Sequence, residues 1–118
     1  MLSVFHNPRC RKSREAIILL KENNLKFIEI LYIKNGLSKK IIQSILEKLR
    51  LEPKDLLRTQ EKIWIESYKD KNLDKDKLID IIIEHPKLME RPIIISHDSG
   101  IIGRPIEGLK NFIKNLKL

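Results

Sequence analysis

The chain has 118 residues, of which 42% are hydrophobic and 34% charged, a composition typical of one folded globular domain with its own core. Its apolar runs are too short to cross a bilayer and its first residues do not form a signal peptide, so we expect a cytoplasmic protein. The net charge of +8 comes mostly from scattered lysines, with few aromatic residues and no zinc-finger spacing. This pattern argues against nucleic-acid binding and favours a small anionic ligand.

The first quarter of the chain predicts a β-α-β unit. Residues 2–5 (LSVF) and 26–31 (KFIEIL) have the short apolar patterns of strands. Residues 10–24 between them predict a helix with one apolar face, formed by Ala16, Ile17 and Leu20. A strand, a crossover helix and another strand are typical of a right-handed parallel unit.

The middle of the chain predicts helices. Residues 38–50 begin at a plausible N-cap, Ser38, and carry an apolar face at helical spacing, formed by Ile41, Ile42, Ile45, Leu46 and Leu49. A shorter helix is predicted over residues 61–70. Another is predicted over residues 74–85, where Leu73 and Leu78 have the spacing of a hydrophobic staple, and Pro86 ends it.

The end of the chain returns to strands. Residues 91–95 and 101–103, joined by the turn SHDSG, predict a β-hairpin, and residues 104–116 predict a closing helix with Pro105 near its first turn. The resulting order is β-α-β, a helical insertion at about 37–85, then β-β-α. This order predicts an α/β thioredoxin-like fold in a single domain of residues 1–118, although fold alone does not give function.

The only cysteine, Cys10, lies in HNPRCRKSR, between the first predicted strand and helix. Free N–H groups and the helix dipole at this position favour a thiolate, the nucleophilic form, and Arg11, Lys12 and Arg14 add positive charge nearby. Ser13 stands where a C-x-x-C motif has its second cysteine, and its hydroxyl can hydrogen-bond the thiolate but cannot resolve a disulfide. A lone thiol needs a second thiol from elsewhere for redox chemistry. The alternative is a buried structural cysteine, which the cationic neighbours disfavour.

Three separated motifs, FHNPRCRKSR, DLLRTQE and ERPIIISHDSGIIGRPIEGL, occur in the order found in one family. By these motifs the sequence resembles the glutaredoxin-linked arsenate reductases over nearly its whole length. The resemblance implies a thioredoxin-like fold, attack of Cys10 on arsenate, an oxyanion site formed by Arg58, Arg91 and Arg104, and a cis peptide before Pro92. Because the sequence ends soon after the closing helix, we expect the shorter subgroup without a C-terminal extension.

Arginine suits the role that the resemblance implies, because its planar fork binds oxyanions by paired hydrogen bonds and stays charged. The alternative for these residues is three surface arginines in unrelated ion pairs. His6 lies in the active-site loop by the same resemblance, where it either tunes or orients Cys10, with Ser13 and Arg14, or only makes a simple hydrogen bond. His85 and His97 show no ligand spacing, so we expect no metal site.

We therefore predict an enzyme that reduces arsenate to arsenite, with no bound cofactor, glutathione as co-substrate and glutaredoxin as the partner that clears the mixed disulfide. We expect a monomer. One alternative is a regulator like the Spx proteins, which bind RNA polymerase, but many of these use a C-x-x-C switch that CRKS cannot form. Another is a related thiol reductase that acts on a different oxidised substrate.

Overall fold

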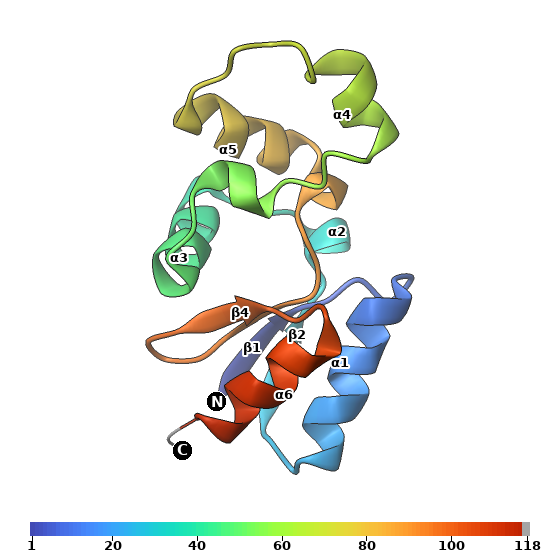
Figure 1. The fold of residues 1–118 in the computed structure, drawn as a ribbon, viewed down its shortest axis with the longest axis vertical. Helices are drawn as coiled ribbons and strands as arrows, with labels where there is room; N and C mark the ends of the chain where they lie inside the picture. The colour runs from blue at the N-terminus through green and yellow to red at the C-terminus, as the bar shows by residue number, and fades with distance from the viewer. Residues whose placement is uncertain (117–118) are drawn as a thin grey trace.

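A four-stranded sheet in the order β2-β1-β3-β4 is the centre of the computed structural model, which describes residues 1–116 (Figure 1). Strand β1 (Leu2–Phe5) pairs in parallel with β2 (Phe27–Ile30). It also pairs antiparallel with β3 (Ile93–Ile95), which in turn pairs antiparallel with β4 (Gly100–Ile102). This α/β arrangement is the thioredoxin-like fold that the order of elements predicted. The last two residues of the predicted domain, 117–118, lie outside the described residues.

One face of the sheet is covered by α1 (Arg11–Glu22) and α6 (Ile106–Lys114), which contact each other (Figure 1). Side chains alternate between the two faces of a strand, so Leu2 and Val4 of β1 point together toward these helices. The apolar face predicted for α1 is confirmed, because it forms part of a buried cluster: Leu2, Val4, Ala16, Ile17, Leu20, Ile94 and Leu109.

The helical insertion between β2 and β3 covers the other face. It consists of α2 (Tyr32–Asn35), α3 (Lys39–Leu49), α4 (Lys62–Ser67), α5 (Lys75–Glu84) and two 3₁₀ turns, η1 (Pro53–Leu56) and η2 (Pro86–Leu88). Phe5 and Ile93 of the sheet join a second buried cluster with this insertion. Helix α3 packs so closely on β4 that a Cβ atom at Gly100 would lie 2.5 Å from the Leu49 side chain.

The predicted N-cap at Ser38 is confirmed, and the helix predicted from residue 74 also has a side-chain N-cap. The Ser38 hydroxyl accepts a hydrogen bond from the Ile41 N–H at 3.1 Å, and the Asp74 carboxylate accepts one from the Lys77 N–H at 2.8 Å. The predicted apolar face of α3 is wrong at Ile41, which is 38% exposed, whereas Ile42 is buried. Adjacent helical positions are about 100° apart around the axis, so Ile41 lies at the edge of the apolar face that Ile42 centres on the core.

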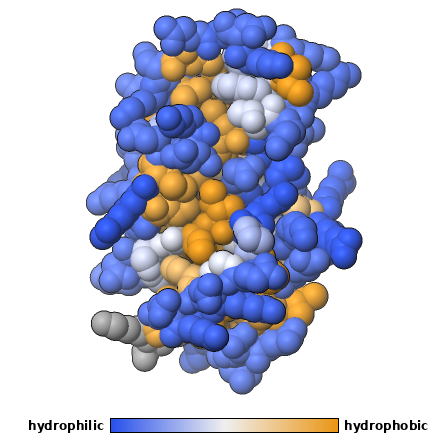
Figure 2. All heavy atoms as spheres, viewed as in Figure 1, coloured by the Kyte–Doolittle hydropathy of each residue, from blue (hydrophilic) through white to orange (hydrophobic). Residues whose placement is uncertain are grey.

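The surface is mostly hydrophilic, as Figure 2 shows for one face. A hydrophobic patch crosses the middle of that face, between the helical insertion and the sheet. The half-buried side chains of α3 and the β3–β4 hairpin that pack onto the core include Leu49, Ile95 and Ile102. Within residues 1–116, none of the helices has the length and apolar character needed to span a membrane.

Candidate active site

Cys10 is the N-cap residue of α1, at the end of a tight loop that follows β1. The Cys10 N–H donates to the Asn7 carbonyl at 2.9 Å, and the Arg14 guanidinium donates to the Pro8 carbonyl at 2.8 Å. These two bonds hold the loop against the first turn of the helix. The half-buried thiol therefore lies at the positive end of the helix dipole, beside N–H groups that have no partner within the helix.

The surroundings of Cys10 favour its thiolate. Burial acts to raise the pKa of the thiol, but the Arg91 guanidinium and the backbone N–H groups of Ser13 and Lys12 favour the thiolate more strongly, so the pKa is lowered. Burial likewise acts to lower the pKa of Arg91, but the nearby Cys10 and Tyr32 raise it, so the guanidinium stays charged. A charged arginine beside a thiol whose pKa is lowered is an arrangement that produces a reactive nucleophile.

Two of the cations that follow Cys10 in the sequence pair with a carboxylate of their own helix. Arg11 and Lys12 both turn to the Glu15 carboxylate, at 3.2 and 3.8 Å, along the exposed side of α1. Side chains three or four residues apart on a helix are neighbours on its surface, so Arg11 and Lys12 pair with Glu15. The cation at the sulfur is Arg91, which comes from the turn before β3.

Ser13 supports the loop through its side chain and the thiol through its backbone. Its buried Oγ lies 2.6 Å from His6 Nδ1 and accepts a hydrogen bond from the Asn7 N–H at 3.0 Å. The predicted bond from this hydroxyl to Cys10 is not among the hydrogen bonds of residues 1–116. Burial is the main cause that lowers the pKa of His6, so its ring is mostly neutral at pH 7 and serves as a hydrogen-bonding partner.

We expect Ser13→Ala to lower the free energy of unfolding by about 1–3 kcal/mol, because it leaves His6 and the Asn7 N–H without their partner inside the protein. The Ser13 N–H remains, so the pKa of Cys10 should change little. Chemical denaturation and the pH dependence of thiol alkylation measure the two effects. The exposed Ser67→Ala is the control. A large rise in the pKa of Cys10 without loss of stability would contradict this role.

The other two predicted oxyanion residues are not among the groups that lower the pKa of Cys10. Arg58 is 17% exposed and donates through Nε to Glu61 at 3.1 Å, while its Nη1 lies 3.9 Å from Glu90. Arg104 is half-buried just before α6, and its side chain has no hydrogen bond or ion pair with any other described residue. The structure therefore brings Arg91 to Cys10 and leaves Arg58 paired with carboxylates. The peptide before Pro92 is cis, as the resemblance implied, and so is the one before Pro105.

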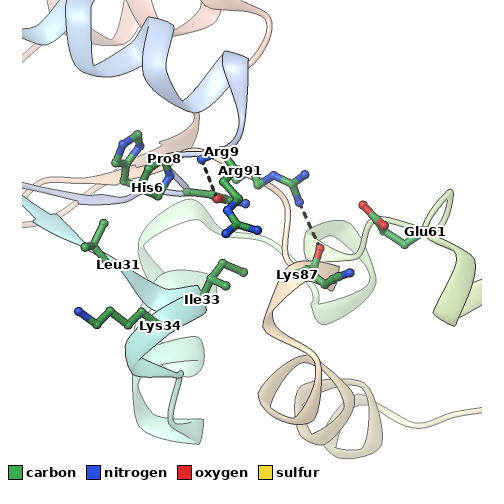
Figure 3. A pocket seen from close by; sticks show the side chains of 10 residues that line it. His6, Pro8, Arg9, Leu31, Ile33, Lys34, Glu61, Lys87 and Arg91 are labelled. Carbon is green, nitrogen blue, oxygen red and sulfur yellow. Dashed lines mark hydrogen bonds between the residues drawn. The ribbon is translucent and has the colours of Figure 1, made fainter.

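A cavity of about 650 Å³ opens beside this site (Figure 3). The loop from His6 to Arg9 lines one side and residues of α2 line another, with Arg91 between them and Glu61 beyond. Four cations and one carboxylate contribute to the lining: Arg9, Lys34, Lys87, Arg91 and Glu61. Arg91 is held in place by a bond from its Nη1 to the Lys87 carbonyl at 3.2 Å. The sequence motifs did not indicate Lys34 or Lys87, which come together only through the packing of α2 on η2.

The lowered pKa of Cys10 gives a direct pH prediction. Because only the thiolate reacts rapidly, the rate of alkylation by iodoacetamide should rise with pH through a midpoint below that of the same chain unfolded in urea. The folded protein should consequently react faster at neutral pH than the ordinary thiol pKa allows. Equal midpoints in the folded and unfolded chains would show that Arg91 and the helix N-terminus do not stabilise the thiolate.

The fold and this site together define a thioredoxin-like protein with a single activated cysteine. Among residues 1–116, no group of three or more His, Cys, Asp and Glu side chains could hold a metal ion. The chain belongs to the ArsC family, whose sequence pattern matches residues 5–112. This family includes arsenate reductases, which places the chain among thiol oxidoreductases.

Individual relatives match over most of their length. An arsenate reductase from Haemophilus influenzae is 38% identical over 88% of this chain and 91% of its own. The uncharacterised protein YfgD of Escherichia coli is 36% identical over 90% of this chain and 91% of its own. The structure of an arsenate reductase from Vibrio cholerae superposes with a TM-score of 0.88 at 32% identity, covering 93% of this chain and 95% of that one. The resemblance noted in the sequence is thus confirmed at the level of the family.

Proposed function

We propose that this protein reduces arsenate to arsenite, with Cys10 as the nucleophile and glutathione as the second thiol. The observation that carries the proposal is the position of Cys10, whose pKa is lowered at the N-terminus of α1 beside Arg91. Arsenate is a tetrahedral anion near neutral pH, so an attacking thiolate meets charge repulsion. A guanidinium next to the sulfur offsets that repulsion and holds an arsenate oxygen in reach.

The reaction balances with two thiols and one arsenate. The Cys10 thiolate forms a bond to arsenic, and one arsenate oxygen leaves as water after taking up protons. The glutathione thiolate then attacks the adduct, two electrons pass from the two sulfurs to arsenic, and arsenite leaves. Cys10 remains joined to glutathione as a mixed disulfide. Because the chain has one cysteine, an external thiol must release it, and we assign this step to glutaredoxin.

The cavity beside Cys10 supports a thiol co-substrate that carries carboxylates. Glutathione has two carboxylates, and the lining supplies cations from three directions, at Arg9, Lys34 and Lys87. The volume of the cavity, about 650 Å³, is within the range of small-molecule sites. Such a co-substrate could therefore bind with its sulfur near Arg91 and Cys10.

Arg58 and Arg104 complete the proposed oxyanion site together with Arg91. Arg58 is close enough for its charge to influence the pKa of Tyr32, which the charges of Cys10 and Arg91 also influence. For Arg58 to bind arsenate it must loosen its pairing with Glu61, an exchange of one charge-assisted partner for another. His6, Ser13 and Arg14 hold the loop that carries the nucleophile.

A coupled assay tests the proposal. It contains arsenate, glutathione, glutaredoxin, glutathione reductase and NADPH, and measures NADPH consumption that depends on both arsenate and the protein. We expect turnover that stops when any one thiol component is omitted. Lack of turnover with arsenate, in a preparation whose Cys10 is reduced, would refute arsenate as the substrate and favour a reductase for another oxidised compound or a regulator.

A further inference from the structure

Tyr32 has a buried hydroxyl without a partner. The residue belongs to α2, its exposed fraction is 0%, and its Oη makes no hydrogen bond to any described residue. A buried polar group in this state costs about 1–3 kcal/mol, and native proteins contain few of them. A second such atom, Nε of Arg91, lies in the same region. No other side-chain nitrogen or oxygen in residues 1–116 is both buried and unpaired.

The two unpaired groups lie near the proposed substrate site. The Tyr32 hydroxyl is close enough to Arg91, Cys10 and Arg58 for all three charges to act on it. The contact between α2 and η2 brings Tyr32 toward the segment that leads to Arg91. The flanking residues Leu31 and Ile33 line the cavity in Figure 3 together with Arg91.

Both unpaired groups, the Tyr32 hydroxyl and Arg91 Nε, can donate a hydrogen bond. An arginine Nε can only donate, and a tyrosine hydroxyl donates one hydrogen bond. A ligand with several acceptor oxygens, set close together, would satisfy both. Burial is the largest influence on Tyr32 and raises its pKa to about 12, so the hydroxyl keeps its proton at any working pH. It would therefore act as a neutral donor beside the charged guanidinium.

We infer that the Tyr32 hydroxyl donates a hydrogen bond to the oxyanion that Arg91 holds beside Cys10, which makes Tyr32 a further substrate-binding residue. This inference rests on the proposed function. It accounts for both unpaired atoms, because a single tetrahedral oxyanion offers one oxygen to Nε of Arg91 and another to the phenol. It also assigns α2 a role, since this short helix carries Tyr32 into the core.

The test compares Tyr32→Phe with a matched control, Tyr68→Phe, which makes the same chemical change at the other tyrosine. The Tyr68 hydroxyl lies 3.3 Å from His85 Nε2, and its ring packs on Trp64 with centroids 5.8 Å apart. The readout is protection of Cys10 from iodoacetamide by arsenate, and by phosphate as an unreactive analogue. Thermal unfolding without anion is measured in parallel.

We expect Tyr32→Phe to raise the anion concentration for half-protection about tenfold, which corresponds to about 1.4 kcal/mol. Its unfolding temperature should stay the same or rise, because the lost hydroxyl had no partner. Tyr68→Phe should leave protection unchanged. Unaltered protection in Tyr32→Phe would overturn this inference alone, and so would a loss of protection matched by a large loss of stability. If the wild-type chain shows no protection by either anion, the oxyanion site itself is refuted, and the inference with it.

Discussion

Cys10→Ser should abolish arsenate-dependent turnover, to below the detection limit of the coupled assay. A serine hydroxyl is almost fully protonated at neutral pH and is a far weaker nucleophile than a thiolate. The chain has no second cysteine to substitute for it. Because Cys10 is half-buried and its side chain accepts no capping hydrogen bond from α1, the exchange should leave the fold intact.

The circular dichroism spectrum and the thermal unfolding of Cys10→Ser provide the control for folding. A variant that is folded and inactive supports direct attack by the thiol. Substantial residual turnover in the folded variant would show that another group reacts with arsenate, and the site would need to be placed elsewhere.

Arg91→Ala should reduce kcat/KM for arsenate. The expected reduction corresponds to about 2–4 kcal/mol of lost transition-state stabilisation, which is typical of one preorganised oxyanion donor. Arg91 is the residue whose removal acts twice, since it also lowers the pKa of the Cys10 thiol. We therefore expect the midpoint of Cys10 alkylation to move to higher pH in the same variant. Arg91→Lys should rescue part of the activity, because an ammonium keeps the charge but loses the planar fork.

Arg11→Ala is the matched control for Arg91→Ala. Arg11 follows Cys10 directly in the sequence, but its side chain is 82% exposed and pairs with Glu15. Its removal should change neither kcat/KM nor the alkylation midpoint by more than about twofold, since exposed ion pairs contribute little. Equal losses in both variants would mean that net charge, and not the position of Arg91, supports the reaction.

Replacing Arg58 or Arg104 by Ala should reduce kcat/KM for arsenate by a factor similar to that of Arg91→Ala. Neither replacement should move the midpoint of Cys10 alkylation.

The fold could be predicted from local patterns wherever an element is long enough to show one. The strand at residues 2–5 and the N-cap at Ser38 are confirmed because each depends on a few adjacent residues. The short helix α2 and the turns η1 and η2 were missed. An element of three or four residues has no helical period, and its shape is set by the neighbours it packs against.

The site was predictable in part. The position of Cys10 at a helix N-terminus follows from the order of strand and helix, but the identity of the cation beside it does not. Ser13 shares the buried helical stripe of Ala16 and Ile17, a spacing that indicates a hydroxyl directed inward rather than toward the thiol. Tyr32 comes two residues after β2 and His6 comes directly after β1, and parallel neighbouring strands end at one edge of a sheet. That signal was present in the sequence but could be read only with the pairing known.

A single-turnover experiment tests the central claim most directly. Reduced protein is mixed with glutathione, with and without arsenate, in the absence of glutaredoxin, and the intact mass and the arsenite formed are measured. We predict one glutathione on Cys10, the only cysteine, formed only when arsenate is present and in a one-to-one ratio with arsenite. Arsenite without a mixed disulfide, or no reaction of reduced Cys10 with arsenate and glutathione, would contradict the account.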